Sequence, residues 1–199
     1  VCHGSRPVIY NVTIVNNSEA GIYLRSAGST IFPHPTIVNS IIHGNLDNNQ
    51  IHFGSSGSVV DISYCLVEEG QDSIAFTVND TLNWGSGNID VDPMFVDTTN
   101  ENYQLLATSQ LINAGHPDST DSDGTRADIG AYPYLNTYSG PTWYVSAANG
   151  NNTTATGAST APFKSIQSAI NFATTTSDSV TVAAGTYVEN INFRGRNIK

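Results

Sequence analysis

Charged residues are scarce in this sequence. They make up 12% of its 199 residues, with 7 Lys and Arg against 17 Asp and Glu and a formal net charge of -10. So few cations cannot neutralise many phosphates, and the negative charge disfavours an anionic lipid surface. We therefore expect neither nucleic acid nor a membrane surface as a partner. No stretch reaches the roughly 18 apolar residues of a membrane-spanning helix, so no membrane insertion is expected either.

Cysteine is nearly absent. The two that occur, Cys2 and Cys65, are too few for a disulfide framework, and neither belongs to a Cys-x-x-Cys metal pair. Cys65 stands in an apolar, strand-like run at residues 62–67. The sequence therefore predicts a buried thiol that packs as a small hydrophobic side chain.

Small polar and β-branched residues are abundant instead. The chain has 21 Asn, 21 Ser and 21 Thr, and 39% of its residues are hydrophobic. Short runs rich in Val and Ile alternate with turns of Gly, Asn and Ser, which is typical of a β-protein and not of disorder or a helical bundle. The predicted strands cover residues 8–15, 21–24, 36–43, 51–53 and 59–67.

These strands belong to an internal repeat. Residues 11–17 align with residues 39–45 at an offset of 28, and Ile42 aligns with Leu66 at a further offset of 24. A repeat of this length predicts a solenoid, in which each coil buries its inner face against its neighbours. Asn at equivalent turns tolerates the left-handed backbone that such turns need. We therefore predict an all-β parallel β-helix.

A series of motifs follows the repeat. Between residues 87 and 132 stand Gly-Asn-Ile-x-x-Asp-Pro-x-Phe-Val, Tyr-x-Leu, Ser-x-Leu-Ile-Asn-Ala-Gly and Asp-Ile-Gly-Ala-Tyr. In this order they resemble the C-terminal end of secreted right-handed β-helix surface proteins, of the pectate-lyase-like and polymorphic-outer-membrane-protein-like kind. The resemblance covers residues 7–134. It implies that residues 1–132 are the last coils and C-terminal region of a right-handed parallel β-helix.

A second resemblance begins after residues 133–142, whose Pro, Gly, Asn and Ser predict a linker. Residues 143–199 resemble the start of such a β-helix, with an N-terminal capping segment and a first coil. Apolar residues recur with helical spacing from Phe163 to Ala173, which predicts a short amphipathic helix near 162–174. The resemblance implies that this helix caps the first coil.

The two resemblances stand in inverted order, the end of a β-helix before the beginning of one. Three arrangements are open: a junction between two β-helices, one permuted β-helix, or a subunit that completes the β-helix of the next copy. The ten-residue linker at 133–142 spans at most about 35 Å, and about five coils need about 24 Å, so closure within the chain and exchange both fit. We expect partners at the coil ends, either another copy or a neighbouring β-helix domain.

An acidic loop is the strongest candidate for a metal site. Four aspartates alternate with small residues around Gly124, namely Asp118, Asp121, Asp123 and Asp128. Calcium takes six to eight oxygen ligands in such tight loops, so these residues are a candidate calcium site. Calcium is the one candidate cofactor. The match to an EF-hand loop is partial, because Gly130 stands where the final Glu belongs. The alternative is a solvated turn in which Arg126 pairs with a nearby Asp.

No catalytic residue is predicted. Three further aspartates cluster in the sequence, Asp90, Asp92 and Asp97. Glycoside hydrolases use two carboxylates about 5–9.5 Å apart, but Asp92 precedes Pro93 and is more simply explained by a turn. The resemblance also includes polysaccharide lyases, which combine calcium-binding aspartates with a basic residue as proton acceptor. Arg6 and Arg25, near His3, are the candidates for this basic residue.

The remaining polar and aromatic residues favour structural roles. The five histidines show no metal-binding spacing, and they are His3, His34, His43, His52 and His116. Trp84 and Trp143 could stack on sugars, with packing over the coil ends as the alternative. We therefore expect a non-catalytic, adhesin-like structural module, secreted or on the cell surface, which assembles into a fibre and contacts glycans. The alternative is a polysaccharide lyase or hydrolase, or a carbohydrate-binding module.

Overall fold

The computed structural model describes residues 1–28, 30–46 and 49–199. The chain divides into two compact units, each of which is treated by itself. The first unit comprises Val1–Asp92, Ala114–Ser119 and Arg126–Ala131. The second comprises Pro93–Asn113, Thr120–Thr125 and Tyr132–Lys199. Within the described ranges, no helix has the length and apolar character needed to cross a membrane.

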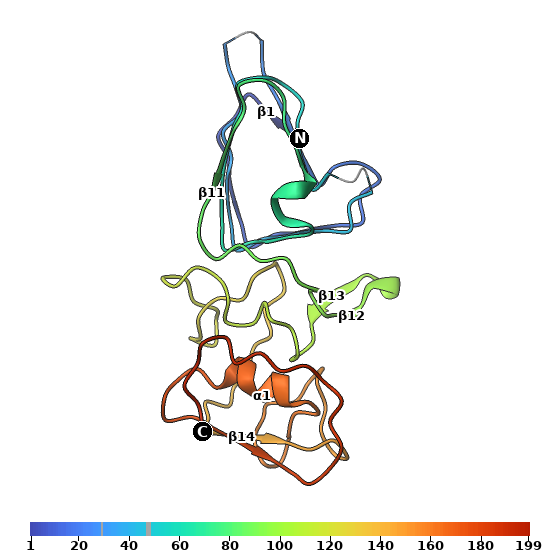
Figure 1. Ribbon diagram of the computed structural model, residues 1–199, viewed down its shortest axis with the longest axis vertical. Coiled ribbons are helices and arrows are strands. Elements are labelled where there is room, and N and C mark those ends of the chain that lie inside the picture. Colours follow the sequence, from blue (N-terminus) through green and yellow to red (C-terminus); the bar gives the residue numbers. More distant parts are fainter. Residues whose placement is uncertain (29, 47–48) are drawn as a thin grey trace. The chain divides into compact units, whose positions relative to one another are not determined.

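Short parallel strands build the first unit and stack in successive coils (Figure 1). One sheet has the order β1 (Cys2–His3), β4 (Ile22–Arg25), β7 (Ile51–Phe53), β10 (Ile74–Ala75). The second has the order β2 (Val8–Tyr10), β5 (Thr36–Val38), β8 (Val59–Ser63), β11 (Thr81–Trp84). The third consists of β3 (Thr13–Val15), β6 (Ile41–His43) and β9 (Leu66–Val67), and the 3-10 helix η1 (Gly70–Ser73) precedes β10. This arrangement confirms the predicted parallel β-helix-like fold.

The strand register confirms the first predicted offset and corrects the second. Thr13 pairs with Ile41, which is an offset of 28 residues (41 minus 13). Ile41 then pairs with Leu66, an offset of 25 (66 minus 41), whereas the sequence alignment placed Leu66 opposite Ile42. Ile41 and Ile42 are both buried, so hydrophobicity alone could not tell which of them stands in register.

The core of the first unit is an apolar stack inside the coils. Ile37 is fully buried and pairs in register with Ile9 on one side and Ile62 on the other. Ile62 is 2% exposed, whereas Ile9, in the edge strand β2, is only partly buried. An inner residue therefore needs a coil on each side to be fully covered, as expected for a solenoid.

A ladder of polar side chains supports the corner between the second and third sheets. The equivalent left-handed residues at this corner, each with a φ of 51°, are Asn11, Asn39 and Tyr64. The residue that follows each one donates its backbone N–H to a side chain of the next coil. Ser40 Oγ accepts from the Val12 N–H at 3.3 Å, Cys65 Sγ from the Ser40 N–H at 3.4 Å, and Asn88 Oδ1 from the Cys65 N–H at 3.0 Å. Cys65 is a fully buried free thiol, as predicted.

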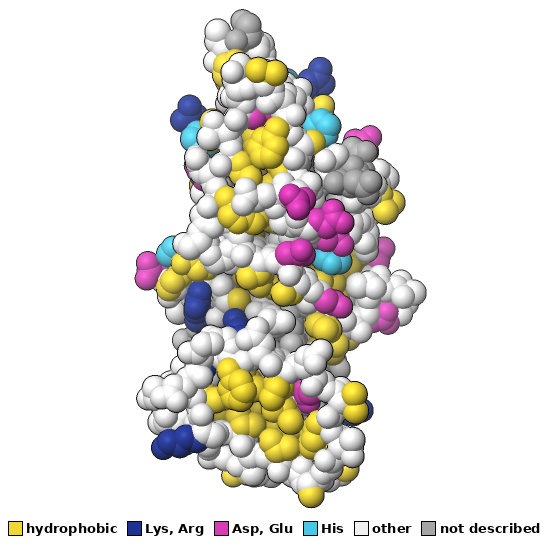
Figure 2. All heavy atoms as spheres, in the orientation of Figure 1, with side chains coloured by type: hydrophobic (Ala, Val, Ile, Leu, Met, Phe, Trp, Pro, Cys, Tyr) yellow, Lys and Arg dark blue, Asp and Glu magenta, His cyan; other side chains and the backbone are white. Residues whose placement is uncertain are grey.

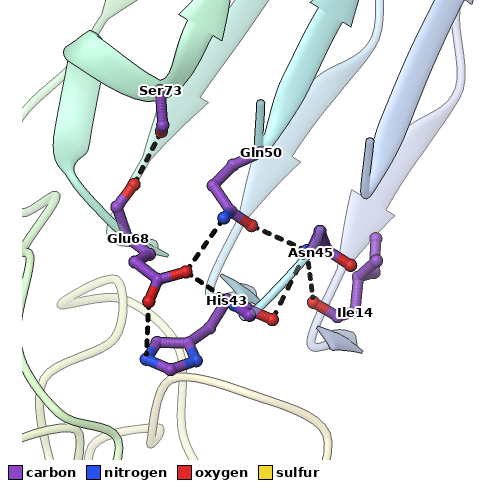
Figure 3. Close-up of polar contacts among 7 residues, drawn as sticks. Ile14, His43, Asn45, Gln50, Glu68 and Ser73 are labelled. Carbon is purple, nitrogen blue, oxygen red and sulfur yellow. Dashed lines mark hydrogen bonds and ion pairs between the residues drawn. The ribbon is translucent and has the colours of Figure 1, made fainter. Parts of the chain in front are cut away.

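A second polar network ties together the coils at the corner between the third and first sheets (Figure 3). Asn45, 5% exposed, accepts from the Asn17 N–H at 3.2 Å and donates to Gln50 Oε1 at 2.6 Å. Gln50 donates to Glu68 Oε2 at 3.0 Å, and the Gly44 N–H donates to the same oxygen at 2.7 Å. One chain of hydrogen bonds thus crosses three successive coils, which explains why Asn and Gln are buried here.

The second unit holds two separate strand pairs. β12 (Phe95–Asp97) and β13 (Asn102–Leu105) are antiparallel around the 3-10 helix η2 (Thr98–Asn100), while β14 (Thr142–Val145) and β15 (Ser179–Val182) are parallel. Lys199 extends the parallel pair. The Val180 N–H donates to Lys199 O at 2.8 Å, and the Lys199 N–H donates to Asp178 O at 3.1 Å. This alternation is the bonding of a parallel ladder, so Lys199 takes the place of a third strand beside β15.

The predicted helix is confirmed but is shorter. α1 spans Ile166–Phe172, because Phe163 is extended and forms a parallel bridge with Val145. Residues 167–172 are all buried, so α1 is covered all round and has no exposed polar face. Its ends are held by residues that come later in the chain. Glu189 accepts from the Ile166 and Gln167 N–H groups at 2.8 and 2.9 Å, and Arg196 donates to Asn171 O at 2.7 Å.

The compact units follow other boundaries than the predicted domains at 1–132 and 143–199. Residues 93–113 belong to the same unit as the C-terminal segment. The predicted linker at 133–142 also lies in this unit and is anchored in it: the Tyr134 hydroxyl donates to Ala155 O at 2.6 Å, and the Asn136 side chain donates to Thr156 O at 2.9 Å. Aromatic packing of Tyr138 against Trp143 adds to this anchorage.

Candidate functional site

A pocket opens on the side of the first unit, where the turns between the first and second sheets stack. Three successive turns contribute to its lining: Gly4 and Arg6 in the first, residues 30–34 in the second, and Gly57 in the third, which Val59 at the start of β8 follows. Its volume is about 350 Å³, which is in the range of small-molecule sites. Ladder bonds fix the turns, since the His34 N–H donates to Ser5 O at 2.9 Å and the Val59 N–H donates to Pro33 O at 3.0 Å.

A histidine and a carboxylate are paired at this pocket. His34 Nε2 lies 2.7 Å from Asp61 Oδ2, and Asn83 Nδ2 donates to Asp61 Oδ1 at 2.5 Å. Asp61 and Asn83 come from β8 and β11, whose register places them side by side. The hydrogen bond from Asn83, followed by the contact with His34, holds the pKa of Asp61 below its usual value. A carboxylate that orients an imidazole is the arrangement found in acid–base and ligand-binding sites.

The same pocket carries a guanidinium. Arg6 lines it, and Arg6, Arg25 and Arg126 are the only Lys or Arg residues in the ranges that make up the first unit. Arg126 is engaged, because its Nε donates to Gly115 O at 2.7 Å. Figure 2 shows Lys and Arg side chains beside His side chains at the end of this unit where Figure 1 labels β1. Arg6 is thus one of few cations in a chain whose net charge is -10.

An apolar wall completes the pocket. Ile31, Phe32 and Pro33 line it together, and Phe32 is 38% exposed. Gly57, with a φ of +88°, allows the Phe32 ring to lie close, since a Cβ at this position would stand 3.3 Å from the ring. The site thus combines a cation, an oriented imidazole and an aromatic surface.

The four aspartates of the predicted calcium loop fall in different compact units. Asp118 and Asp128 belong to the first unit, and Asp121 and Asp123 to the second. Asp123 is occupied by protein donors: its Oδ1 accepts from the Thr125 N–H at 3.0 Å and its Oδ2 from the Asn136 N–H at 2.8 Å. Among the described residues, no group of three or more His, Cys, Asp or Glu side chains could hold a metal ion. The calcium site stays a prediction from the sequence.

The second aspartate cluster is also divided. Asp97 belongs to the second unit, where it accepts from the Asn100 side chain at 2.6 Å and from two backbone N–H groups of η2, and these bonds hold its pKa below the usual range. Asp90 and Asp92 belong to the first unit. The bonds of Asp97 are those of a helix cap, which is a structural role.

The other histidines predicted to be structural lie on the strands and turns of the first unit. His52 stacks on Tyr23 with ring centroids 4.8 Å apart, and His43 Nε2 lies 3.6 Å from Glu68 Oε1. His3 pairs in register with Arg25 on the sheet of β1 and β4. The structure thus brings together His3 and Arg25, as the sequence suggested, while Arg6 faces the pocket of His34.

The comparisons with known proteins concern the second unit. Residues 148–193 match DUF1565, a family described as a protein of unknown function. The DUF1565 match includes α1 and β15. No curated protein and no solved structure matches the chain.

The sequence reading missed the pair of His34 and Asp61. The two residues are 27 positions apart, close to the coil offsets of 28 and 25. Asp61 pairs in register with Thr36, and His34 reaches it from two residues earlier, so the separation of 27 equals neither coil offset. Their spacing matches no local metal or catalytic motif, which is why a search for such motifs passes over them.

Proposed function

We propose that this protein is a non-catalytic structural module, secreted or on the cell surface, which assembles with a neighbouring β-solenoid through its coil ends. The incomplete burial of Ile9 carries the proposal. Ile37 and Ile62, at the equivalent positions of the next two coils, are at most 2% exposed. A further coil on β2 would give Ile9 the same environment and remove its remaining apolar surface from water.

The backbone of β2 supports this assembly. In a parallel ladder, alternate residues turn both backbone groups to the same side. The Thr36 N–H donates to Pro7 O at 2.9 Å and the Asn11 N–H donates to Val38 O at 3.2 Å, so the odd-numbered residues of β2 face β5. Val8 and Tyr10 therefore offer their N–H and C=O groups to the free edge, which is a template for another strand.

The second unit also builds a parallel ladder at the edge of β15. Lys199 bonds there to both Asp178 and Val180, so the backbone of β15 pairs with a strand on the side away from β14. Apolar side chains are exposed on this C-terminal segment, at Val182, Val188, Ile191 and Phe193. Exposed apolar side chains in this number fit burial under a further coil better than they fit solvent.

The test measures the mass of the species in solution as a function of protein concentration. Light scattering after size exclusion, with negative-stain microscopy, should show larger species or filaments as the concentration rises. Ile9→Lys should keep the chain monomeric, because the introduced ammonium can reach water at an open coil end but not under a stacked coil. Val78→Lys is the control, since Val78 is 74% exposed in a turn. A wild-type chain that stays monomeric and forms no filaments would refute the proposed self-association.

A carbohydrate-active protein is the second candidate, and the pair of His34 and Asp61 near Arg6 favours it. An imidazole held by a carboxylate can accept a proton, and a guanidinium can stabilise a negative charge. Release of reducing ends or unsaturated products from a panel of polysaccharides is the assay. Turnover by the wild type that His34→Gln abolishes would replace the structural proposal with this one.

A further inference from the structure

Two arginines of the first unit are unpaired. Within the described parts of the chain, neither Arg6 nor Arg25 forms a side-chain hydrogen bond or ion pair, although Asp and Glu outnumber Lys and Arg by 17 to 7. The other guanidiniums are used, since Arg126, Arg194 and Arg196 all donate to backbone carbonyls. Arg6 lines the pocket of about 350 Å³, and Arg25 does not.

We infer that this pocket binds a small organic carboxylate, with Arg6 as the partner of the carboxylate group and the wall of Ile31, Phe32 and Pro33 against the body of the ligand. Guanidinium presents parallel N–H donors that match the two oxygens of a carboxylate. The apolar wall suits a flat or ring-shaped body, because an aromatic face such as Phe32 packs well against one. The site lies within the turns of the first unit and does not depend on coil-end assembly.

The charges favour a monoanion over a phosphate dianion. One guanidinium supplies a single positive charge, and the rest of the chain carries an excess of negative charge that repels anions. A second negative charge on the ligand would be repelled by this excess and would have no second Lys or Arg in the pocket lining to pair with. Asp61 is bonded to Asn83 and His34, and no ion pair joins it to Arg6 among the described residues.

His34 gives the pocket a second polar group in a fixed place. Asp61 holds its Nε2 at 2.7 Å, which directs the ring and leaves Nδ1 as the other polar atom of the imidazole. Nδ1 can bond to a hydroxyl or to the second oxygen of the ligand, depending on its protonation. An oriented ring of this kind binds without first losing side-chain freedom.

The experiment is an NMR titration of the whole chain with two matched pairs of probes. Benzoate is compared with benzamide, and glucuronate with glucose, so that each pair differs in the negative charge. Each acid should shift the amide signals of the three turns, at residues 4–6, 30–34 and 57–59, with a dissociation constant on the order of 1 mM for ligands this small. The acid that binds more tightly identifies the body of the ligand as a flat ring or a sugar.

Two arginine variants decide the role of the guanidinium. Arg6→Gln should weaken binding of the acid about tenfold, because it removes charge-assisted hydrogen bonds. Arg25→Gln is the matched control, an unpaired arginine outside the pocket, and should change binding less than about twofold. The inference is overturned if each acid binds no better than its neutral counterpart, if the two variants lose the same affinity, or if no amide of the three turns shifts.

Discussion

The clearest prediction concerns Glu189 and the start of α1. The carboxylate of Glu189 accepts from the Ile166 N–H at 2.8 Å and from the Gln167 N–H at 2.9 Å. The N-cap residue, Ser165, makes no side-chain capping bond, so Glu189 does the work of a cap from a distant part of the chain. Glu189→Ala would leave two N–H groups at the positive end of the helix without their anion.

The expected loss follows from these two bonds. Hydrogen bonds to a charged group contribute about 1.5–3 kcal/mol each, and a lost helix cap costs about 0.5–2 kcal/mol. Glu189 is only half-buried, so water can replace part of what is lost, and we expect a decrease of about 2 kcal/mol in the free energy of unfolding of the second unit. Glu189→Gln keeps one acceptor oxygen and should lose about half as much.

The assay is urea unfolding followed by the fluorescence of Trp143. Trp143 packs against Phe172 of α1, with ring centroids 5.6 Å apart, so its emission reports on the unit that contains the helix. The background carries Trp84→Phe, which leaves Trp143 as the only tryptophan. Glu19→Ala is the control, because Glu19 is exposed. A change for Glu189→Ala no larger than that for Glu19→Ala would refute the cap.

Three further predictions follow from single side chains. Cys65, whose burial raises its thiol pKa to about 12, should not react with a thiol reagent at pH 8 until the protein unfolds, and labelling at the rate of a free thiol would contradict this. Asp61 has a lowered folded pKa, so its contribution to stability is present above its unfolded pKa of about 3.9 and is lost as the pH falls through the lower folded value. Asp61→Asn should therefore flatten the acid side of the stability profile measured by thermal unfolding, and an unchanged slope would count against the pairing. Asn45→Ala should lower the free energy of unfolding of the first unit by about 2–3 kcal/mol, measured by denaturant titration, because it removes the donor to the buried Gln50 Oε1 and the acceptor of the Asn17 N–H. A loss under about 0.5 kcal/mol would mean that water replaces the network.

Local sequence patterns were sufficient for the solenoid and for the position of its apolar runs. The runs predicted as strands at 8–15, 36–43 and 59–67 each divide into two strands, because Asn11, Asn39 and Tyr64 turn the chain with a left-handed backbone. The alignment of residues 11–17 with 39–45 predicted the observed register, because Asn11 and Asn39 occupy the same left-handed turn in successive coils. The next register was wrong by one residue, since the adjacent Ile41 and Ile42 are both buried. The helix was expected to begin near 162, but pairing of Phe163 with Val145, 18 residues earlier, keeps this part of the chain extended.

The amino-acid sequence by itself determined the repeat, the short strands, the buried Cys65 thiol and the presence of one short helix. All of these depend on residues within one coil or on the coil period. Only the tertiary structure decided which polar side chains meet. Asp61 meets Asn83 through strand register and His34 through the turn before β5, and Glu189 and Arg196 hold the ends of α1 from more than 20 residues away. Such contacts depend on the lengths of the turns between strands, and no local pattern of hydrophobicity encodes which residues those turns place side by side.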